Sequence, residues 1–313
     1  MDEFSLIDAL LAEEAPLPDW VRIGPGDDAA VVAAPAGTEW VLSTDSLVEG
    51  RHFPAGLAPD VLAWRALAVN LSDLAAMGAA PGGFLVALVA PTLTADWCRQ
   101  FSAGLRMAAG ESGARLIGGN LARGPLTVTV TVTGTVAAGR SLLRSMAAPG
   151  DRICVSGVLG AALAAREHYE REAPSLAGLD IAGLPDAWRP YLLPVARLGL
   201  GQHLVGQATA CIDVSDGLLA DLGHLCAASG VAADVALAAL PVEGRDPLAA
   251  ATGGDDYELV FTLPPGVPLA PIVAATGVPV TVIGQVRSGS GVRLLDADGS
   301  ERVTEQRGWS HFG

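Results

Sequence analysis

The chain has 313 residues, of which 34 are acidic and 19 basic, and its formal net charge is −15. All 19 basic residues are arginines, which excludes enzyme classes built on a P-loop lysine, a protein-kinase strand lysine, or a Schiff-base or pyridoxal lysine. The acidic balance argues against a nucleic-acid-binding protein, because such a protein needs a basic face to contact phosphates.

Nothing in the sequence indicates export or membrane insertion. The N-terminus is acidic and lacks the basic region of a signal peptide. Two charge-free stretches, 74–95 and 264–286, are interrupted by glycine and proline, so neither can cross a bilayer as one helix. We therefore expect a cytoplasmic protein with no membrane contact. The cysteines lie in apolar contexts without metal-binding spacing and are expected to be buried thiols: Cys98, Cys154, Cys211 and Cys226.

Helices and strands are mixed throughout the first 137 residues. Apolar periodicity and turn residues predict, in chain order, a helix at 4–14, strands at 30–34 and 40–43, a helix at 59–77, a strand at 84–89, a helix at 94–111 and a strand at 127–136. The last of these is predicted from its alternation of threonine and valine.

A polar, turn-rich segment at 137–151 predicts a domain boundary near 138, which gives domains 1–138 and 139–313. The elements expected beyond it are a strand at 153–155, a helix at 158–171, an irregular segment at 172–190, a helix at 194–206, a strand at 208–212, a helix at 217–228, and strands at 258–263 and 279–286. The predicted class is therefore α/β (α+β) with two domains.

Eight of the 21 aspartates gather in five short motifs flanked by glycine or serine. The motifs are IGPGDDAAV with Asp27 and Asp28, LSTDSLVEG with Asp45, NLSDLAAMG with Asp73, CIDVSDGLL with Asp213 and Asp216, and GGDDYELVF with Asp255 and Asp256. Each motif adjoins an apolar run, so these carboxylates are expected at the ends of buried elements. A buried carboxylate without a partner costs several kcal/mol, so each needs an arginine, a helix N-terminus or a cation.

For the set as a whole, hard divalent cations fit best, because oxygen ligands without histidine or thiolate clusters select Mg²⁺, Ca²⁺ or Mn²⁺. Several magnesium ions held by carboxylates indicate a polyphosphate substrate. GPGDD and the Gly-Gly-Asn sequence at 118–120 read as turns, which either bring backbone N–H groups to a phosphate or are plain turns. Ser215 and Asp216 stand at an expected helix start, as an N-cap or facing a phosphate. No G-x-S-x-G motif supports a serine hydrolase.

Taken together and in this order, the motifs resemble the thiamine-monophosphate kinase family, within the aminoimidazole ribonucleotide synthetase-like superfamily. The segments that carry the resemblance span nearly the whole chain: 23–31, STDSLVEGRHF at 43–53, 70–81, 118–125, 142–151, IDVSDGLLADL at 212–222, GGDDYELVFT at 253–262 and GWSHF at 308–312. The resemblance implies two α/β domains with ATP and several Mg²⁺ ions between them, and an N-terminal sheet that forms a barrel across a homodimer. It also implies phosphorylation of thiamine monophosphate to the diphosphate by ATP.

The resemblance further implies roles for individual residues. The positions that match metal ligands or their supports are Asp28, Ser43, Thr44, Asp45, Asp73, Asn120, Asp213 and Asp216. Those that match nucleotide contacts are Gly119, Asn120, Arg144 and Ser215, and those that match contacts to thiamine phosphate are His52, Asp255 and Trp309. Many relatives have aspartate where this chain has Asn120, so the ligand set of one metal site has one negative charge fewer in this chain.

The acceptor is itself a phosphate anion, so we expect direct, metal-assisted transfer with no acid or base residue in a catalytic role. Two alternatives remain open from the sequence. One is another ATP-dependent synthetase of the same superfamily, and the other is a non-catalytic regulator that binds nucleotide or metal, which Asn120 would favour.

Overall fold

The computed structural model describes residues 3–11, 16–24, 30–33, 35–172, 179–305 and 308. The chain divides into two units: residues 1–74, 80–139 and 170–186 form the first, and residues 75–79, 140–169 and 187–313 form the second. The elements of the first half are α1 (Glu3–Leu11), β1 (Val21–Ile23), β2 (Val31–Val32), β3 (Thr38–Val48), α2 (Pro59–Ala76), β4 (Ala80–Ala90), α3 (Ala95–Ser112), β5 (Arg115–Arg123) and β6 (Thr127–Ala137).

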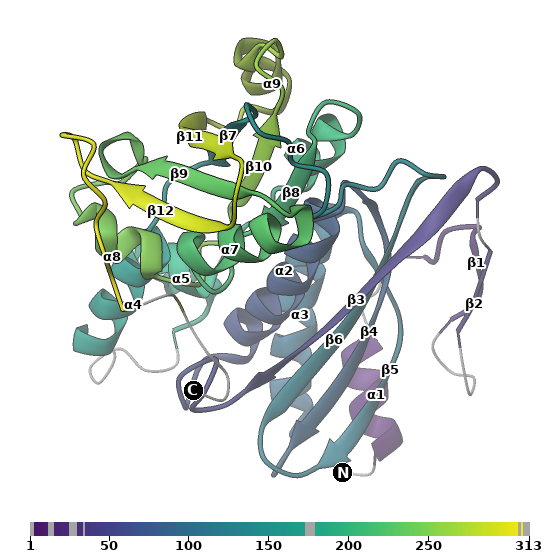
Figure 1. Cartoon of the computed structure of the whole chain (residues 1–313). Coiled ribbons are helices and arrows are strands. Elements are labelled where there is room, and N and C mark those ends of the chain that lie inside the picture. Colours follow the sequence, from purple (N-terminus) through teal and green to yellow (C-terminus); the bar gives the residue numbers. More distant parts are fainter. Residues whose placement is uncertain are drawn as a thin grey trace. The chain divides into compact units, whose positions relative to one another are not determined.

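A four-stranded sheet in the order β3-β6-β4-β5 is the centre of the first unit. The alternation predicted for residues 127–136 is confirmed in β6, where the valines are buried and the threonines between them are half-buried. The cause is the two-residue period of a strand, which sends successive side chains to opposite faces. The buried face is covered by the helices α2 and α3, with α1 against α3 (Figure 1). The described part of this sheet is open, with β3 and β5 at its edges.

Helices α2 and α3 approach closely because α3 carries a glycine at the contact. A Cβ on Gly104 would lie 2.0 Å from the carbonyl oxygen of Asp60, at the start of α2. Helix α3 begins at a Thr94 cap, whose side chain accepts a hydrogen bond from the Trp97 amide, and ends at Gly113 in the left-handed conformation. These are the expected start and stop signals of a helix, so the prediction of a helix at 94–111 is confirmed.

The second unit is built on a six-stranded mixed sheet in the order β12-β9-β11-β7-β10-β8, in which only the β12–β9 pair is parallel. The elements of the chain beyond residue 140 are β7 (Arg152–Ser156), α4 (Ala161–Glu172), the 3-10 helices η2 (Ile181–Gly183) and η3 (Asp186–Trp188), α5 (Arg189–Leu192), α6 (Leu198–Leu204), β8 (Ala210–Asp213), α7 (Leu218–Ser229), β9 (Ala232–Ala236), η4 (Leu237–Ala239), α8 (Pro247–Thr252), β10 (Leu259–Leu263), α9 (Leu269–Thr276), β11 (Val280–Arg287) and β12 (Gly291–Leu295).

This sheet is buried on both faces. One core cluster joins Ile153, Val155 and Val260 of the sheet to α7 and α8, and the other joins Cys154 and Phe261 to α6 and α9. Strand β10 is buried at all five positions. A strand buried on both faces reads as a continuous apolar run instead of an alternating one, which is how 258–263 appears in the sequence.

The structure adds elements that the sequence analysis did not predict: β1, β5, β9, β12, α5, α8, α9 and the 3-10 helices η2, η3 and η4. It also corrects one prediction, because Gly118–Asn120 lie inside strand β5 and form no turn. The described cysteines are all buried and free, as expected. Among the helices of the described ranges, none has the length and apolar character needed to cross a membrane.

Candidate functional site

In the first unit, α2 fixes the middle of strand β3 through two polar side chains one turn apart. The Ser43 hydroxyl donates to Asp73 Oδ2 over 2.6 Å, and the Asp45 amide donates to Asn70 Oδ1 over 2.8 Å. Asn70 is fully buried, and its Nδ2 donates to the Ala66 carbonyl oxygen over 2.8 Å, which fixes its orientation. Asn70 and Asp73 face the same strand because residues three apart share a helix face. The structure therefore brings Ser43, Asp45 and Asp73 together, and Asn70 is a support that the sequence analysis missed.

Thr44 belongs to a different set of contacts. Its hydroxyl lies 3.0 Å from Thr131 Oγ1 and donates to the Val130 carbonyl oxygen over 3.1 Å. Side chains alternate along a strand, so Thr44 points to the face opposite that of Ser43 and Asp45. The structure does not place the Thr44 side chain with Asp73.

Strand β5 carries Gly119 and Asn120 parallel to β4, where they pair with Val86 and Ala87. A Cβ on Gly119 would lie 2.2 Å from the Val86 carbonyl oxygen, so only glycine allows the two strands to come this close. The run of glycines that suggested a turn reflects this close strand contact instead. Asn120 is exposed.

His52 lies in the turn that follows β3. Its Nδ1 accepts a hydrogen bond from the Val48 amide over 3.0 Å, and its own amide donates to the Val48 carbonyl oxygen over 2.9 Å. An Nδ1 that accepts leaves the proton of the neutral imidazole on Nε2, so Nε2–H is the group that His52 can offer to a phosphate.

In the second unit, the loop after β8 brings three carboxylates close to one another. Asp213 ends the strand and is buried, and α7 begins after Gly217, which has a φ of 116° and gives no side-chain cap. Neither Ser215 nor Asp216 is therefore the N-cap of this helix. Asp221, in the first turn of α7, accepts hydrogen bonds from the amides of Asp216 and Gly217 at Oδ2, over 3.0 and 3.1 Å.

The pKa of Asp221 is raised to about 8, first by burial and then by the negative charges of Asp213 and Asp216, which together outweigh the lowering effect of its two amide hydrogen bonds. Asp221 was absent from the predicted site residues. The available signal was its place four residues beyond Gly217 in an otherwise apolar helix turn, where a carboxylate needs a partner.

The GGDDYE segment lies directly against this loop, although about 40 residues separate the two in sequence. The amide of Asp255 donates to the Ser215 carbonyl oxygen over 2.8 Å, and the amide of Tyr257 donates to that of Val214 over 2.8 Å. A Cβ on Gly254 would lie 2.6 Å from the Ser215 carbonyl oxygen, so the close approach requires glycine there. The structure therefore brings Asp255 beside Ser215, as a shared site requires.

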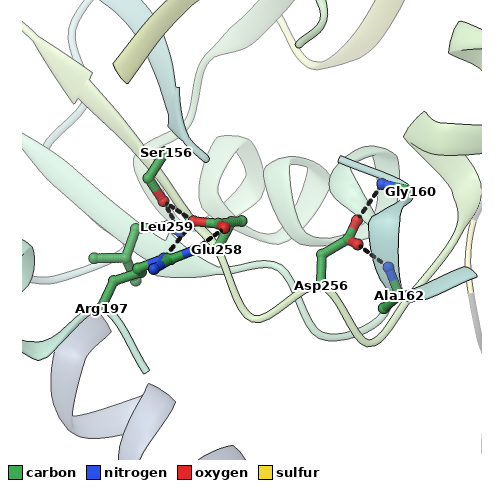
Figure 2. A network of polar contacts seen from close by, with 7 residues as sticks. All are labelled: Ser156, Gly160, Ala162, Arg197, Asp256, Glu258 and Leu259. Atoms are coloured by element: carbon green, nitrogen blue, oxygen red, sulfur yellow. Dashed lines mark hydrogen bonds and ion pairs between the residues drawn. The ribbon is translucent and has the colours of Figure 1, made fainter. Parts of the chain in front are cut away.

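Two carboxylates, the partly buried Asp256 and the buried Glu258, anchor the same segment (Figure 2). Asp256 accepts from the amides of Gly160 and Ala162 at the start of α4, over 2.7 and 3.1 Å. Glu258 accepts from the Ser156 hydroxyl over 2.5 Å and forms a two-point ion pair with Arg197, whose Nε donates over 2.8 Å. Burial raises the pKa of Asp256 to about 7 in spite of its two amide partners.

Arg144 is exposed and lies on a loop that is fastened to the last residue of α7. The Ser229 hydroxyl donates to the Arg144 carbonyl oxygen over 2.8 Å and accepts from the amides of Met146 and Ala147, each over 3.1 Å. The guanidinium of Arg144 is thus carried by a fixed backbone at the surface of the second unit.

Two predicted site residues, Asp28 and Trp309, lie outside the described residues. Among the residues that are described, no three histidine, cysteine or carboxylate side chains form a group of the kind that holds a metal ion by itself. The chemistry of the donors still fits a hard cation. The negative charges of Asp213 and Asp216 raise the pKa of Asp221, and a divalent ion with a preference for oxygen ligands would relieve the repulsion among these carboxylates.

Comparison with known proteins agrees with these features. Two family models match the chain: that of the N-terminal domain of AIR synthase related proteins at residues 26–136, and that of their C-terminal domain at residues 148–296. The thiamine-monophosphate kinase of Escherichia coli K12 is 40% identical over 306 residues, which is 93% of this chain and 92% of that protein.

Solved structures give the same result. The crystal structure of thiamine-monophosphate kinase from Stenotrophomonas maltophilia K279a has a TM-score of 0.85 and 40% identity, and the match covers 96% of this chain and 98% of that one. The structure of AaThiL complexed with AMPPCP and TMP has a TM-score of 0.76 and 30% identity over 99% of this chain and 97% of that one. The resemblance seen in the motifs is confirmed, and the chain belongs to the thiamine-monophosphate kinase family of the AIR synthase related proteins.

Proposed function

We propose that this chain is an enzyme that transfers the γ-phosphoryl group of ATP to the phosphate of thiamine monophosphate and releases ADP and thiamine diphosphate. The observation that carries the proposal is its identity of 40% with the E. coli thiamine-monophosphate kinase over 93% of the chain. The solved AaThiL complex with AMPPCP and TMP, at 30% identity over nearly the whole chain, supports the same pair of substrates.

In the reaction, an oxygen of the thiamine phosphate attacks the γ-phosphorus, and the bond from that phosphorus to the β-phosphate oxygen breaks. The electron pair of the broken bond leaves with ADP. The acceptor oxygen is already anionic, so no side chain has to remove a proton, and the proposal assigns no acid or base. The chain must hold the two substrates in position and neutralise the negative charge of their phosphates.

Carboxylates on both units are the proposed holders of Mg²⁺. In the first unit these are Asp45 and Asp73, with Ser43 as a support, since α2 and β3 bring them together. In the second unit they are Asp213 and Asp216, whose charges raise the pKa of Asp221 and so mark a place that favours a cation. Bound Mg²⁺ would supply positive charge that offsets the repulsion between the triphosphate of ATP and the phosphate of thiamine monophosphate.

Asp28, Thr44 and Asn120 complete the proposed metal set by resemblance to the family. The proposed contacts to ATP are Gly119, Asn120, Arg144 and Ser215. Arg144 is suited to this role because an exposed guanidinium can grip a phosphate with two parallel hydrogen bonds.

The proposed contacts to thiamine monophosphate are His52, Asp255 and Trp309. His52 can donate from Nε2 to the phosphate, since its Nδ1 is already used as an acceptor. The thiazolium ring carries a positive charge, which suits both the Asp255 carboxylate and the aromatic face of Trp309.

A homodimer in which two N-terminal sheets form a barrel is also part of the proposal. Strand β3 supports it, because it is an 11-residue strand at the edge of its sheet and carries Leu42 with 65% of its surface exposed. A long edge strand with an exposed apolar side chain is a surface that pairs readily with another chain. A cytoplasmic location, without membrane or nucleic-acid partners, stays a prediction from the sequence.

The test is to incubate the protein with ATP, Mg²⁺ and thiamine monophosphate, and to measure thiamine diphosphate and ADP. We expect both products in equal amounts, and neither when thiamine monophosphate or Mg²⁺ is left out. A folded protein, verified by circular dichroism, that forms neither product would contradict the proposal. ADP without thiamine diphosphate would identify a different acceptor.

A further inference from the structure

The backbone of the GGDDYE segment is held in an unfavourable conformation at two positions. Asp255 has a φ of 71° and Tyr257 a φ of 50°, and among the described residues Met146 is the one other non-glycine residue with a positive φ. The left-handed region is unfavourable for a residue with a Cβ, and such strain persists only where the surroundings impose it. What imposes it here is therefore informative about the role of the segment.

The residues that alternate with the strained ones are its anchors (Figure 2). Asp256 accepts two amide hydrogen bonds at the N-terminus of α4, where the helix dipole also stabilises a carboxylate. Glu258 is 4% exposed and is bound by Arg197 and the Ser156 hydroxyl. The segment is thus fixed at every second residue, and the backbone between the anchors has little freedom.

The strained positions present two side chains that contact each other. The Tyr257 hydroxyl donates to Asp255 Oδ1 over 3.3 Å, and both side chains are partly exposed, unlike the buried Glu258. A donor at Oδ1 restricts the rotation of the Asp255 carboxylate. The carboxylate that the proposed function assigns to the thiamine substrate is therefore held in one orientation before the substrate arrives.

We propose that Asp256 and Tyr257 are positioning residues for Asp255: Asp256 holds the strained backbone, and the Tyr257 hydroxyl orients the carboxylate toward thiamine monophosphate. The inference rests on the proposed function. It adds two residues that position Asp255 for the thiamine substrate, and it assigns neither of them a contact with ATP. It predicts that the loss of either residue raises the KM for thiamine monophosphate more than the KM for ATP.

The decisive variant is Tyr257→Phe, which removes the hydroxyl and leaves the ring and the backbone. Tyr169→Phe is the matched control, because Tyr169 lies in the second unit and packs edge-on against Trp188. We expect Tyr257→Phe to raise the KM for thiamine monophosphate between about twofold and tenfold, the range of one hydrogen bond, with the KM for ATP and the melting temperature unchanged. Tyr169→Phe should leave both KM values unchanged.

Asp256→Asn is the second variant, since an amide can accept from only one of the two α4 amides. We expect it to raise the KM for thiamine monophosphate more than the KM for ATP, with a lower melting temperature. If Tyr257→Phe leaves both KM values at the wild-type level, or raises both equally, the inference is wrong whatever Asp256→Asn does. A wild-type protein without thiamine monophosphate kinase activity would overturn the proposed function and this inference together, whereas active wild type with unchanged Tyr257→Phe overturns the inference alone.

Discussion

Replacing Asp221 by asparagine isolates the cost of a buried charge from the value of its hydrogen bonds. Asp221 accepts hydrogen bonds from the backbone amides of Asp216 and Gly217, and both amides donate to the same oxygen, Oδ2. An asparagine with its Oδ1 in that place keeps both hydrogen bonds and removes the charge. Asp221→Asn should therefore leave the loop in position while changing how the free energy of unfolding depends on pH.

The sign follows from proton binding. The pKa of Asp221 is raised from 3.8 to about 8 in the folded chain, so between these values the folded state keeps a proton that the unfolded state releases. Wild-type stability consequently falls as the pH rises through this window, by about 1.4 kcal/mol per pH unit and at most about 6 kcal/mol in all. Below about pH 4 both states are protonated and the effect is absent.

The assay is urea unfolding of both proteins in Mg²⁺-free buffer at about pH 5 and about pH 8, where most of the window is covered. The difference in free energy of unfolding between Asp221→Asn and wild type should shift in favour of the variant by several kcal/mol from the lower pH to the higher one. Asp19→Asn, at an exposed position, removes the same formal charge and serves as the control. Parallel pH profiles for Asp221→Asn and wild type would show that Asp221 is ionised in the folded protein and would refute the reasoning.

Three further predictions concern single positions. Asp45→Asn should abolish turnover with an unchanged melting temperature, because the Asp45 amide that donates to Asn70 is retained; measurable turnover at wild-type rates would remove Asp45 from the metal site. Gly157→Ala should lower the free energy of unfolding by at least about 2 kcal/mol, since Gly157 has a φ of 56° and its new Cβ would lie 2.0 Å from Glu258 Oε1. Ser229→Ala should raise the KM for ATP and spare that for thiamine monophosphate, because it releases the Arg144 loop; equal KM values for wild type and variant would separate this loop from ATP binding.

The glycine prediction has an internal control. Gly223 lies inside α7, where a Cβ would meet nothing within 4 Å, so Gly223→Ala should raise stability by up to about 1 kcal/mol through helix propensity. Urea unfolding of the two glycine variants side by side separates the effect of position from the effect of added bulk. A Gly157→Ala protein as stable as wild type would show that the Glu258 side chain can move away at little cost.

The elements that the sequence predicted well are those with a clear periodic pattern. Strand β6 was located within about two residues, because its 11 residues alternate between buried and less buried positions along most of their length. Helix α2 was also located within about two residues from the apolar periodicity of its sequence, although residues 61–72 are all buried in the structure. Strands β9 and β12 were not predicted. They are five residues long, and each is stabilised by pairing with a strand elsewhere in the chain, which a local pattern does not record.

The same limit applied to the candidate site. The sequence identified the residue types and motifs, but Gly118–Asn120 looked like a turn because the strand that requires their close approach, β4, is about 30 residues away. Asp221 was not recognised for a similar reason, since its partners are backbone amides that carry no residue-type signal.

By itself, the sequence determined that no lysine is available to bind phosphate, that carboxylates gather in five motifs, and that these motifs resemble one family. Only the tertiary structure decided which motifs share a site within a unit. Antiparallel pairing of β8 with β10 places Leu259 opposite Asp213, and so brings Ser215 against Asp255 across about 40 residues of chain. That pairing depends on burying both faces of a six-stranded sheet, a condition of the whole unit and of no single segment.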